Sequence, residues 1–162
     1  EAAERLRSKY GNVAEFQLIG GLDDHPGAIT KAQLENICDG EYIKWLGYRT
    51  DVRELLMQCH IVAFPSYYME GLPKSLIEAD AIGRPVITSD SIGCRDTVVD
   101  GYNGFLIKPK DVDALTAKLD LLISDKVLRK QMGLNSRKYA EKYFSIEDVV
   151  KKHLAIYQEL IN

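Results

Sequence analysis

The sequence predicts an α/β fold in which helices cover both faces of a doubly wound parallel sheet. Segments of strand character alternate with segments of helical character from the first residues to position 108. The run 61–65 (IVAFP) is apolar throughout, as expected of a strand that is buried on both faces of a parallel sheet. Helical segments, not tight hairpin turns, separate the strand-like ones, which favours right-handed βαβ crossovers.

The expected elements follow one another with short connections. Strands are predicted at residues 15–20, 42–46, 61–65, 85–89 and 104–108. Helices are predicted from the first residues to Tyr10, and at residues 28–38, 51–58, 73–82, 112–123, 126–143 and 146–161. Thr50 is expected to cap the helix 51–58, and Ser145, with Asp148 in a weaker form of the capping box, the last helix. The third of the chain after residue 108 is thus predicted to be helical.

Composition excludes several classes of protein. The 162 residues are 46% hydrophobic and 28% charged, which is typical of one globular domain and not of a disordered or fibrous chain. A formal net charge of −3 argues against binding of nucleic acid, or of an anionic membrane, by bulk charge. The apolar runs are shorter than the roughly 20 residues that span a bilayer.

Cysteine and histidine spacing predicts neither a disulfide framework nor a metal site. Cys38, Cys59 and Cys94 are odd in number and form no CxxC pair, so we interpret them as reduced thiols of a cytoplasmic protein. The three histidines are scattered and have no zinc-ligand spacing. We therefore expect no metal and no cofactor.

The segment 65–83 (PSYYMEGLPKSLIEADAIG) carries the clearest signal for chemistry. A buried strand ends, a loop of small residues follows, and Pro73 is expected at the first helical position. The N–H groups of Lys74, Ser75 and Leu76 would then have no intrahelical acceptor. Together with the helix dipole they predict an anion site, to which the Ser75 hydroxyl and the Lys74 charge can add.

Two carboxylates flank this predicted anion site. Glu70 precedes the helix, and Glu78 lies five residues beyond Pro73, roughly 7–8 Å along the axis at ~1.5 Å per residue. A helical glutamate is usually a solvated surface residue, but the apolar neighbours of Glu78 favour a ligand role. A carboxylate can accept hydrogen bonds from two vicinal hydroxyls. This arrangement fits a ligand with phosphate at its centre and hydroxyls at both ends. A nucleotide diphosphate sugar is such a ligand.

The stretch EGLPKSLIEADAIGRPVITSDSIGCRDTVVDGYNGFLIKP resembles the donor-binding half of retaining family 4 glycosyltransferases, which have the GT-B architecture. The hallmark of that family is two glutamates separated by seven residues, here Glu70 and Glu78. The resemblance covers most of residues 15–111 and is most specific over 61–109. The segment EGLPKS further resembles the corresponding segment of bacterial enzymes that build capsule, O-antigen or lipid-linked oligosaccharides.

The resemblance implies a role for each matching residue. Glu70 would contact the transferred sugar near its reacting carbon, as the catalytic residue, and Glu78 would hold the ribose hydroxyls. The other donor-binding positions would line the crevice, contact the base, approach the sugar or bind the phosphates: Gly20, Tyr48, Arg49, Gly71, Leu72, Pro73, Lys74, Ser75, Leu76 and Gly93. The chain departs from the family pattern at Met69, where close relatives often have Arg, and at Asp96, where Glu is usual.

The resemblance also implies parts that this sequence does not contain. In the family, a strand and a Lys-Gly turn precede the helix that opens this chain, and an acceptor domain lies further upstream. Residues 1–162 would then be a Rossmann-like nucleotide-sugar binding domain truncated at its N-terminus, with 112–162 as its C-terminal helices. The absent strand would occupy the middle of the sheet. We expect either that the remaining strands close up or that another segment or chain fills the place.

The expected function is hexosyl transfer from a nucleotide diphosphate sugar, with a UDP-sugar first among donors, to an acceptor hydroxyl with retention of configuration. The acceptor, a glycan or a lipid-linked sugar, would bind through the absent domain, and the fragment alone would be inactive. We expect the protein to act in the cytoplasm, or at the inner face of the cell membrane through peripheral association of the full-length protein. We expect no nucleic-acid partner. The alternatives are a GT-B nucleotide-sugar epimerase and a non-catalytic nucleotide-binding module. A dehydrogenase fits poorly, because the segment 20–23 (GGLD) is not GxGxxG.

Overall fold

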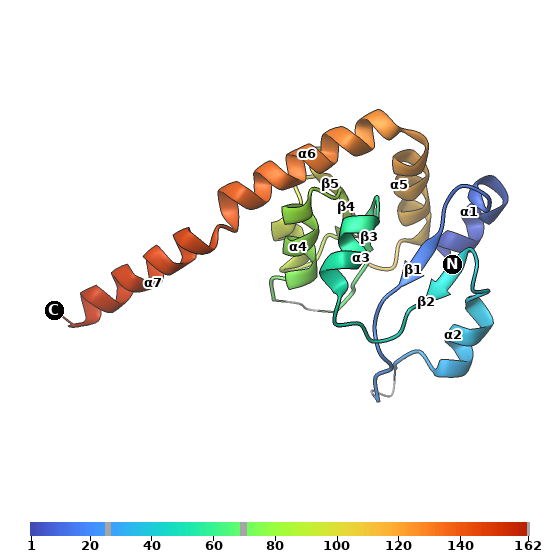
Figure 1. Cartoon of the computed structure of the whole chain (residues 1–162), viewed down its shortest axis with the longest axis horizontal. Helices are drawn as coiled ribbons and strands as arrows, with labels where there is room; N and C mark the ends of the chain where they lie inside the picture. Colours follow the sequence, from blue (N-terminus) through green and yellow to red (C-terminus); the bar gives the residue numbers. More distant parts are fainter. Residues whose placement is uncertain (25–26, 69–70, 162) are drawn as a thin grey trace.

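The computed structural model describes residues 1–24, 27–68 and 71–161 (Figure 1). Its elements in chain order are α1 (Ala2–Tyr10), β1 (Phe16–Leu18), α2 (Lys31–Ile37), β2 (Ile43–Trp45), α3 (Val52–Gln58), β3 (Val62–Phe64), α4 (Lys74–Ile82), β4 (Val86–Ser89), the 3-10 helix η1 (Cys94–Thr97), β5 (Gly104–Ile107), α5 (Val112–Ser124), α6 (Lys126–Tyr143) and α7 (Ile146–Ile161). Each predicted strand and helix is present within a few residues of its expected bounds. Only η1 was not expected.

All strand pairs are parallel, as predicted, but the sheet is in two parts. β1 pairs with β2, and β4 lies between β3 and β5. In the part of the chain that the structure describes, β1 and β3 do not pair with each other. The remaining strands therefore have not closed up, and two strand edges are open at the place where the resemblance puts a central strand.

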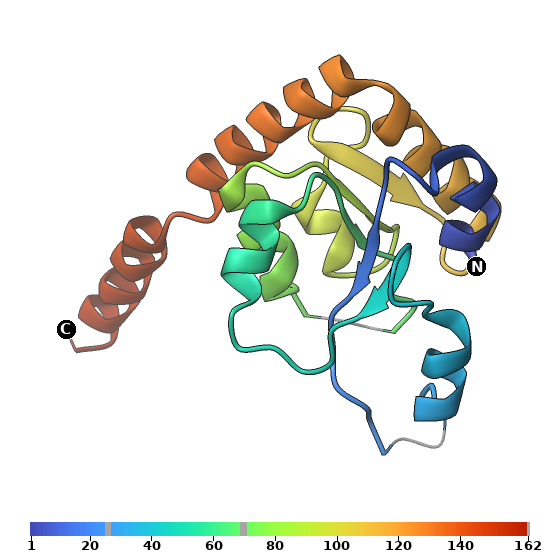
Figure 2. The same ribbon diagram turned by 45° about the vertical axis from the view of Figure 1, so that its right-hand side comes forward.

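One hydrophobic core nevertheless joins the two parts of the sheet. Leu6 and Tyr10 of α1 pack in the same buried cluster as Ile87 of β4. Phe16 of β1 and Ile61, which precedes β3, both pack against that cluster. α1 and α5 lie together on this face (Figure 2). A second cluster on the opposite face joins α3 and α4 to β4, so helices cover both faces as a doubly wound sheet requires.

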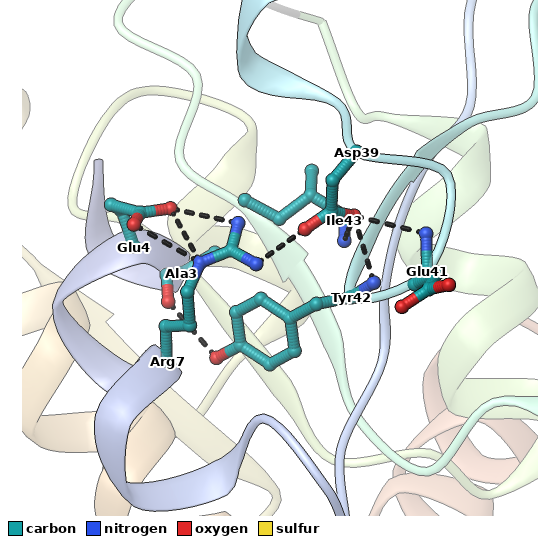
Figure 3. A network of polar contacts seen from close by, with 7 residues as sticks. All are labelled: Ala3, Glu4, Arg7, Asp39, Glu41, Tyr42 and Ile43. Atoms are coloured by element: carbon teal, nitrogen blue, oxygen red, sulfur yellow. Dashed lines mark hydrogen bonds and ion pairs between the residues drawn. The ribbon is translucent and has the colours of Figure 1, made fainter.

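A polar network fixes the amino end of β2 to α1 (Figure 3). The Asp39 carboxylate accepts hydrogen bonds from the backbone N–H groups of residues 41–43, at 2.8–3.0 Å. The Arg7 guanidinium binds the same carboxylate and lies 4.7 Å from the centre of the Tyr42 ring. The N–H donors, led by that of Ile43, and the Arg7 cation hold the pKa of Asp39 well below its usual range. This network is structural and belongs to the amino edge of the sheet.

The last helix, α7, points away from the rest of the molecule (Figures 1 and 2). None of its described residues is buried. Large apolar side chains are exposed along it: Ile146, Val149, Val150, Leu154, Ile156, Tyr157, Leu160 and Ile161. Of the helices that the structure describes, none is long and apolar enough to cross a membrane.

Two predicted helix caps differ from the structure. The residue before α3 is Asp51, so Thr50 lies one position outside the cap. Before α7, the Ser145 hydroxyl donates to the Glu147 carboxylate at 2.7 Å instead of forming a box with Asp148. Both differences concern single terminal residues, where sequence signals are least exact.

Candidate functional site

The loops that follow β1 and β2 meet at the carboxyl edge of the sheet. The Gly20 N–H donates to the Gly47 carbonyl at 2.9 Å, and Trp45 Nε1 donates to the Gly20 carbonyl at 2.9 Å. A Cβ atom at Gly21 would lie 3.6 Å from Cβ of Tyr48. Two predicted crevice residues, Gly20 and Tyr48, are therefore close together. Ligands of doubly wound sheets bind at this edge.

The two residues predicted to contact the base differ in how free they are. The Tyr48 side chain is 80% exposed, so its ring faces are open to a planar ligand. Arg49 is held by its neighbour Asp51, with Nε at 2.8 Å from Oδ1 and Nη2 at 2.5 Å from Oδ2. This bidentate pair lowers the pKa of Asp51 and raises that of Arg49. Arg49 therefore orders the loop as well as adding a charge to it.

The start of α4 has two free N–H groups where three were predicted. Pro73 is buried, has ψ 117° and takes the N-cap position, so the helix begins at Lys74 and not at Pro73. The Leu76 N–H donates to the Pro73 carbonyl at 3.1 Å, so the prediction that it lacks an intrahelical acceptor is wrong. The cause is a tight first turn with i to i+3 geometry. In the described part of the chain, the backbone N–H groups of Lys74 and Ser75 have no backbone acceptor.

Glu78 lies on the same helix, one turn further, and is paired. Its side chain is 38% exposed, and its Oε1 lies 3.6 Å from Nζ of Lys74, whose own side chain is 88% exposed. The interpretation of Glu78 as a charge in apolar surroundings is thus corrected: the carboxylate reaches water and a cation. Such an exposed i, i+4 pair stabilises a helix by only about 0.3–0.5 kcal/mol, so a ligand can replace it at small cost.

The first glutamate of the motif, Glu70, lies outside the described residues, together with Met69. The structure describes the next two predicted residues, Gly71 and Leu72, which are exposed directly before Pro73. The structure therefore positions the second carboxylate and the helix start, and the chain connects Glu70 to them through two exposed residues.

Gly93 lies in the loop between β4 and η1, on the same edge of the sheet. It is buried and has φ 83°, a backbone conformation that L side chains rarely adopt. Nearby at the end of β4, the Ser89 side chain is fully buried, and the hydroxyls of Ser89 and Ser91 have no hydrogen-bond partner among the described residues. The sequence carries no signal for these serines, because a serine at a strand end is indistinguishable from a solvated turn residue.

The described surface has two hollows. One of about 510 Å³ lies at the amino edge and is lined in part by Arg7, Asn12 and Asp39. Another of about 390 Å³ lies beside β2 and is lined in part by Leu34 and Trp45. Neither contains a predicted donor-binding residue. Within the described residues, no group of three or more His, Cys, Asp or Glu side chains is arranged to hold a metal ion.

The family model described as "Glycosyl transferases group 1" matches residues 1–139. The chain belongs to this family. It is 35% identical to an N,N'-diacetylbacillosaminyl-diphospho-undecaprenol alpha-1,3-N-acetylgalactosaminyltransferase of Campylobacter jejuni. The aligned 161 residues cover 99% of this chain and 40% of that relative. It is 35% identical over 154 residues to the capsular polysaccharide biosynthesis glycosyltransferase CapM of Staphylococcus aureus, covering 95% of this chain and 40% of the relative.

A solved structure agrees with the fold. A variant of Staphylococcus aureus TarM, crystallised with fondaparinux, α-GlcNAc-glycerol and UDP, superposes with a TM-score of 0.82 at 25% identity, over 96% of this chain and 31% of that chain. The glycosyltransferase resemblance and the Rossmann-like GT-B fold are thereby confirmed. The chain spans about 40% of the length of the two curated relatives above.

Proposed function

We propose that this chain is the donor-binding part of a glycosyltransferase that moves a hexosyl unit from a nucleotide diphosphate sugar to an acceptor hydroxyl with retention of configuration. The observation that carries the proposal is the start of α4. Its N–H groups at Lys74 and Ser75 and the carboxylate of Glu78 lie one turn apart in the loop-and-helix segment that holds the family's glutamate pair. The proposed donor is a UDP-sugar, and the UDP in the TarM crystal supports that choice.

The proposed chemistry is electrostatic. As the bond to the sugar breaks, negative charge develops on the leaving diphosphate. The N–H groups of Lys74 and Ser75, with the dipole of α4 behind them, stabilise this charge without reorganisation. Glu78 accepts hydrogen bonds from the ribose hydroxyls, Tyr48 stacks on the base, and Glu70 orients the transferred sugar. No step in this scheme needs a metal ion or a cofactor.

The acceptor is proposed to be a glycan or a lipid-linked sugar that binds through the part of the protein outside this chain. The names of the Campylobacter and Staphylococcus relatives, which refer to a diphospho-undecaprenol sugar and to capsule, support this class. The proposed place of action is the cytoplasm or the inner face of the membrane. The chain alone is proposed to bind donor without transferring sugar, because orientation of the acceptor needs the remainder.

Binding and transfer test the proposal separately. Isothermal titration of this chain with UDP, ADP and GDP should give heat with UDP, and Glu78→Gln should weaken binding about tenfold or more, as expected for a lost hydrogen bond to a charged group. In the longer protein, Glu70→Gln should lower kcat for sugar transfer. Glu141→Gln, on the exposed end of α6, is the matched control. Wild-type transfer by both site variants would contradict the proposal, and conversion of the donor into an isomeric nucleotide sugar would indicate an epimerase instead.

A further inference from the structure

Two adjacent tyrosines and a lysine from distant loops form an exposed cluster at the carboxyl edge. The rings of Tyr67 and Tyr68 are 4.5 Å apart at an angle of 31°, and their hydroxyls are 3.3 Å apart. The side chains are 49% and 52% exposed. Nζ of Lys110 lies 4.6 Å from the centre of the Tyr67 ring. The tyrosines follow β3 and the lysine follows β5, so the contact joins two loops 43 positions apart.

The backbone presents Lys110 in an unusual conformation. Its φ is 64°, and it is the one residue other than glycine with positive φ in the described part of the chain. The turn is fixed on its far side, because the Asp111 N–H donates to the Lys108 carbonyl at 3.1 Å and the Asp111 carboxylate caps α5 through the Ala114 N–H at 2.8 Å. Left-handed conformations of bulky residues are strained, and such strain is concentrated at functional sites.

The loop after β5 carries two lysines, Lys108 and Lys110. Within residues 1–24, 27–68 and 71–161, neither Lys108 nor Lys110 takes part in an ion pair, although both are exposed. By contrast, Lys74 at the start of α4 is paired with Glu78. A cation held beside an aromatic face is therefore available to an anionic ligand.

The cluster and Tyr48 come from different loops at the carboxyl edge of the sheet. Tyr48, the proposed base contact, follows β2, whereas Tyr67 and Lys110 follow β3 and β5 in the other part of the sheet. The pKa of Tyr68 is raised, chiefly by its hydrogen bond with Tyr67 and in smaller part by the charge of Asp23 in the loop after β1. The tyrosines thus lie in the loop between β3 and α4, within reach of the charge of Asp23.

We propose that Tyr67, Tyr68 and Lys110 form this chain's own contact with the acceptor, whose main binding site lies outside this chain, and that the group bound there is a saccharide that carries a phosphate or diphosphate. This inference rests on the proposed function, since the donor occupies the start of α4. Exposed tyrosine faces can pack on the apolar C–H face of a sugar ring while their hydroxyls hydrogen-bond to its substituents. The Lys110 ammonium binds the phosphate as a point charge.

Saturation-transfer NMR and isothermal titration on this chain can test the subsite with glucose 1-phosphate as the probe, at saturating UDP. The probe should bind and receive saturation on its ring protons, and methyl α-glucoside and inorganic phosphate should each bind at least tenfold more weakly. Lys110→Gln and Tyr67→Leu should each weaken binding of the probe about tenfold and leave the dissociation constant of UDP unchanged. Lys130→Gln, which removes an exposed lysine of α6, is the matched control.

Lys110→Gly separates binding from folding. This variant removes the ammonium and relieves the left-handed backbone, so its thermal midpoint should equal or exceed that of the wild type while binding of the probe is lost. Lys110→Arg should retain binding. A short-chain prenyl diphosphate glucose that binds more tightly than glucose 1-phosphate would assign the subsite to lipid-linked acceptors, and equal binding would assign it to free phosphosugars.

Three results overturn the subsite. The first is displacement of the probe by UDP, which would place the cluster in the donor site. The second is unchanged binding of the probe by Lys110→Gly. The third is binding of methyl α-glucoside as tight as that of the probe. Failure of the proposed function has a different signature, because UDP would then give no heat while the probe still binds and responds to Lys110→Gln.

Discussion

The side-chain amide of Asn103 donates a hydrogen bond to the carboxylate of Asp80, with Nδ2 at 3.2 Å from Oδ1, although both side chains are fully buried. The same amide donates to the Thr97 carbonyl at 3.0 Å, and the Ser136 hydroxyl donates to the Asn103 carbonyl at 3.0 Å. One asparagine therefore ties α4, η1 and α6 together before β5 begins. The second carboxylate oxygen of Asp80 has no hydrogen-bond partner among the described residues.

The buried Asp80 carboxyl should make stability depend on pH. Burial raises its pKa to about 7, against the opposing effect of Ser136 and Asn103, from 3.8 for an exposed group. Between these values the folded state binds a proton that the unfolded state releases, so the free energy of unfolding should fall as pH rises, by up to about 1.4 kcal/mol per pH unit. Urea unfolding between pH 4.5 and 8 measures this slope. Asp80→Asn should flatten it, Glu159→Gln on α7 should not, and an unchanged slope in Asp80→Asn would refute the assignment.

The close contact of α4 with α6 should not tolerate a side chain at Gly133. A Cβ atom there would lie 2.4 Å from the Gly83 carbonyl oxygen and 3.7 Å from Cδ of Pro85. Because the nearest atom is backbone, the two helices must separate, and Gly133→Ala should destabilise the fold by about 1–3 kcal/mol despite its better helix propensity. Thermal unfolding by circular dichroism measures the loss. Lys138→Ala on the exposed side of α6 is the control, and a Gly133→Ala variant as stable as this control would show that the helices adjust freely.

Local patterns predicted most of the fold because each element carries its own signal. The apolar run that contains Val62 and Phe64 predicted a strand, and Gly83 ends α4 where a left-handed C-cap is expected. The prediction that this strand is buried on both faces is wrong, because Val62 and Phe64 are only half-buried and Ala63 is exposed beside the open edge of the sheet. The predictions that were wrong concern properties that the spacing of apolar and polar residues does not encode. The Leu76 N–H found an acceptor because of the ψ angle of Pro73, and the contact of Tyr67 with Lys110 joins loops that no local pattern relates. Likewise, an acidic residue inside a helix is usually predicted to be exposed, whereas Asp80 is fully buried.

The two open strand edges should behave as an acceptor for another strand. The Phe16 N–H bonds the Tyr42 carbonyl and the Val62 N–H bonds the Pro85 carbonyl, so alternation turns the N–H groups of Gln17 and Ala63 to the unpaired sides. We expect a segment of the longer protein, or another chain, to pair with both edges. Hydrogen exchange should then slow by roughly tenfold or more at these two amides in the longer protein, relative to this chain. Fast exchange at both amides in the longer protein would contradict the prediction.

The role proposed for Glu78 can be tested with a donor that lacks one hydroxyl. If the carboxylate accepts hydrogen bonds from both ribose hydroxyls, this chain should bind UDP more tightly than 2′-deoxy-UDP, by about tenfold or more. Glu78→Gln should bind both nucleotides with similar affinity, because the charged acceptor is gone. Lys74→Gln should keep the preference for UDP, since it removes only the cation that pairs with Glu78 at 3.6 Å. Titration calorimetry on the three proteins gives the ratio of the affinities for UDP and 2′-deoxy-UDP. Equal affinities in the unmodified chain would show that Glu78 does not bind the ribose. That result would not affect the diphosphate site proposed at Lys74 and Ser75.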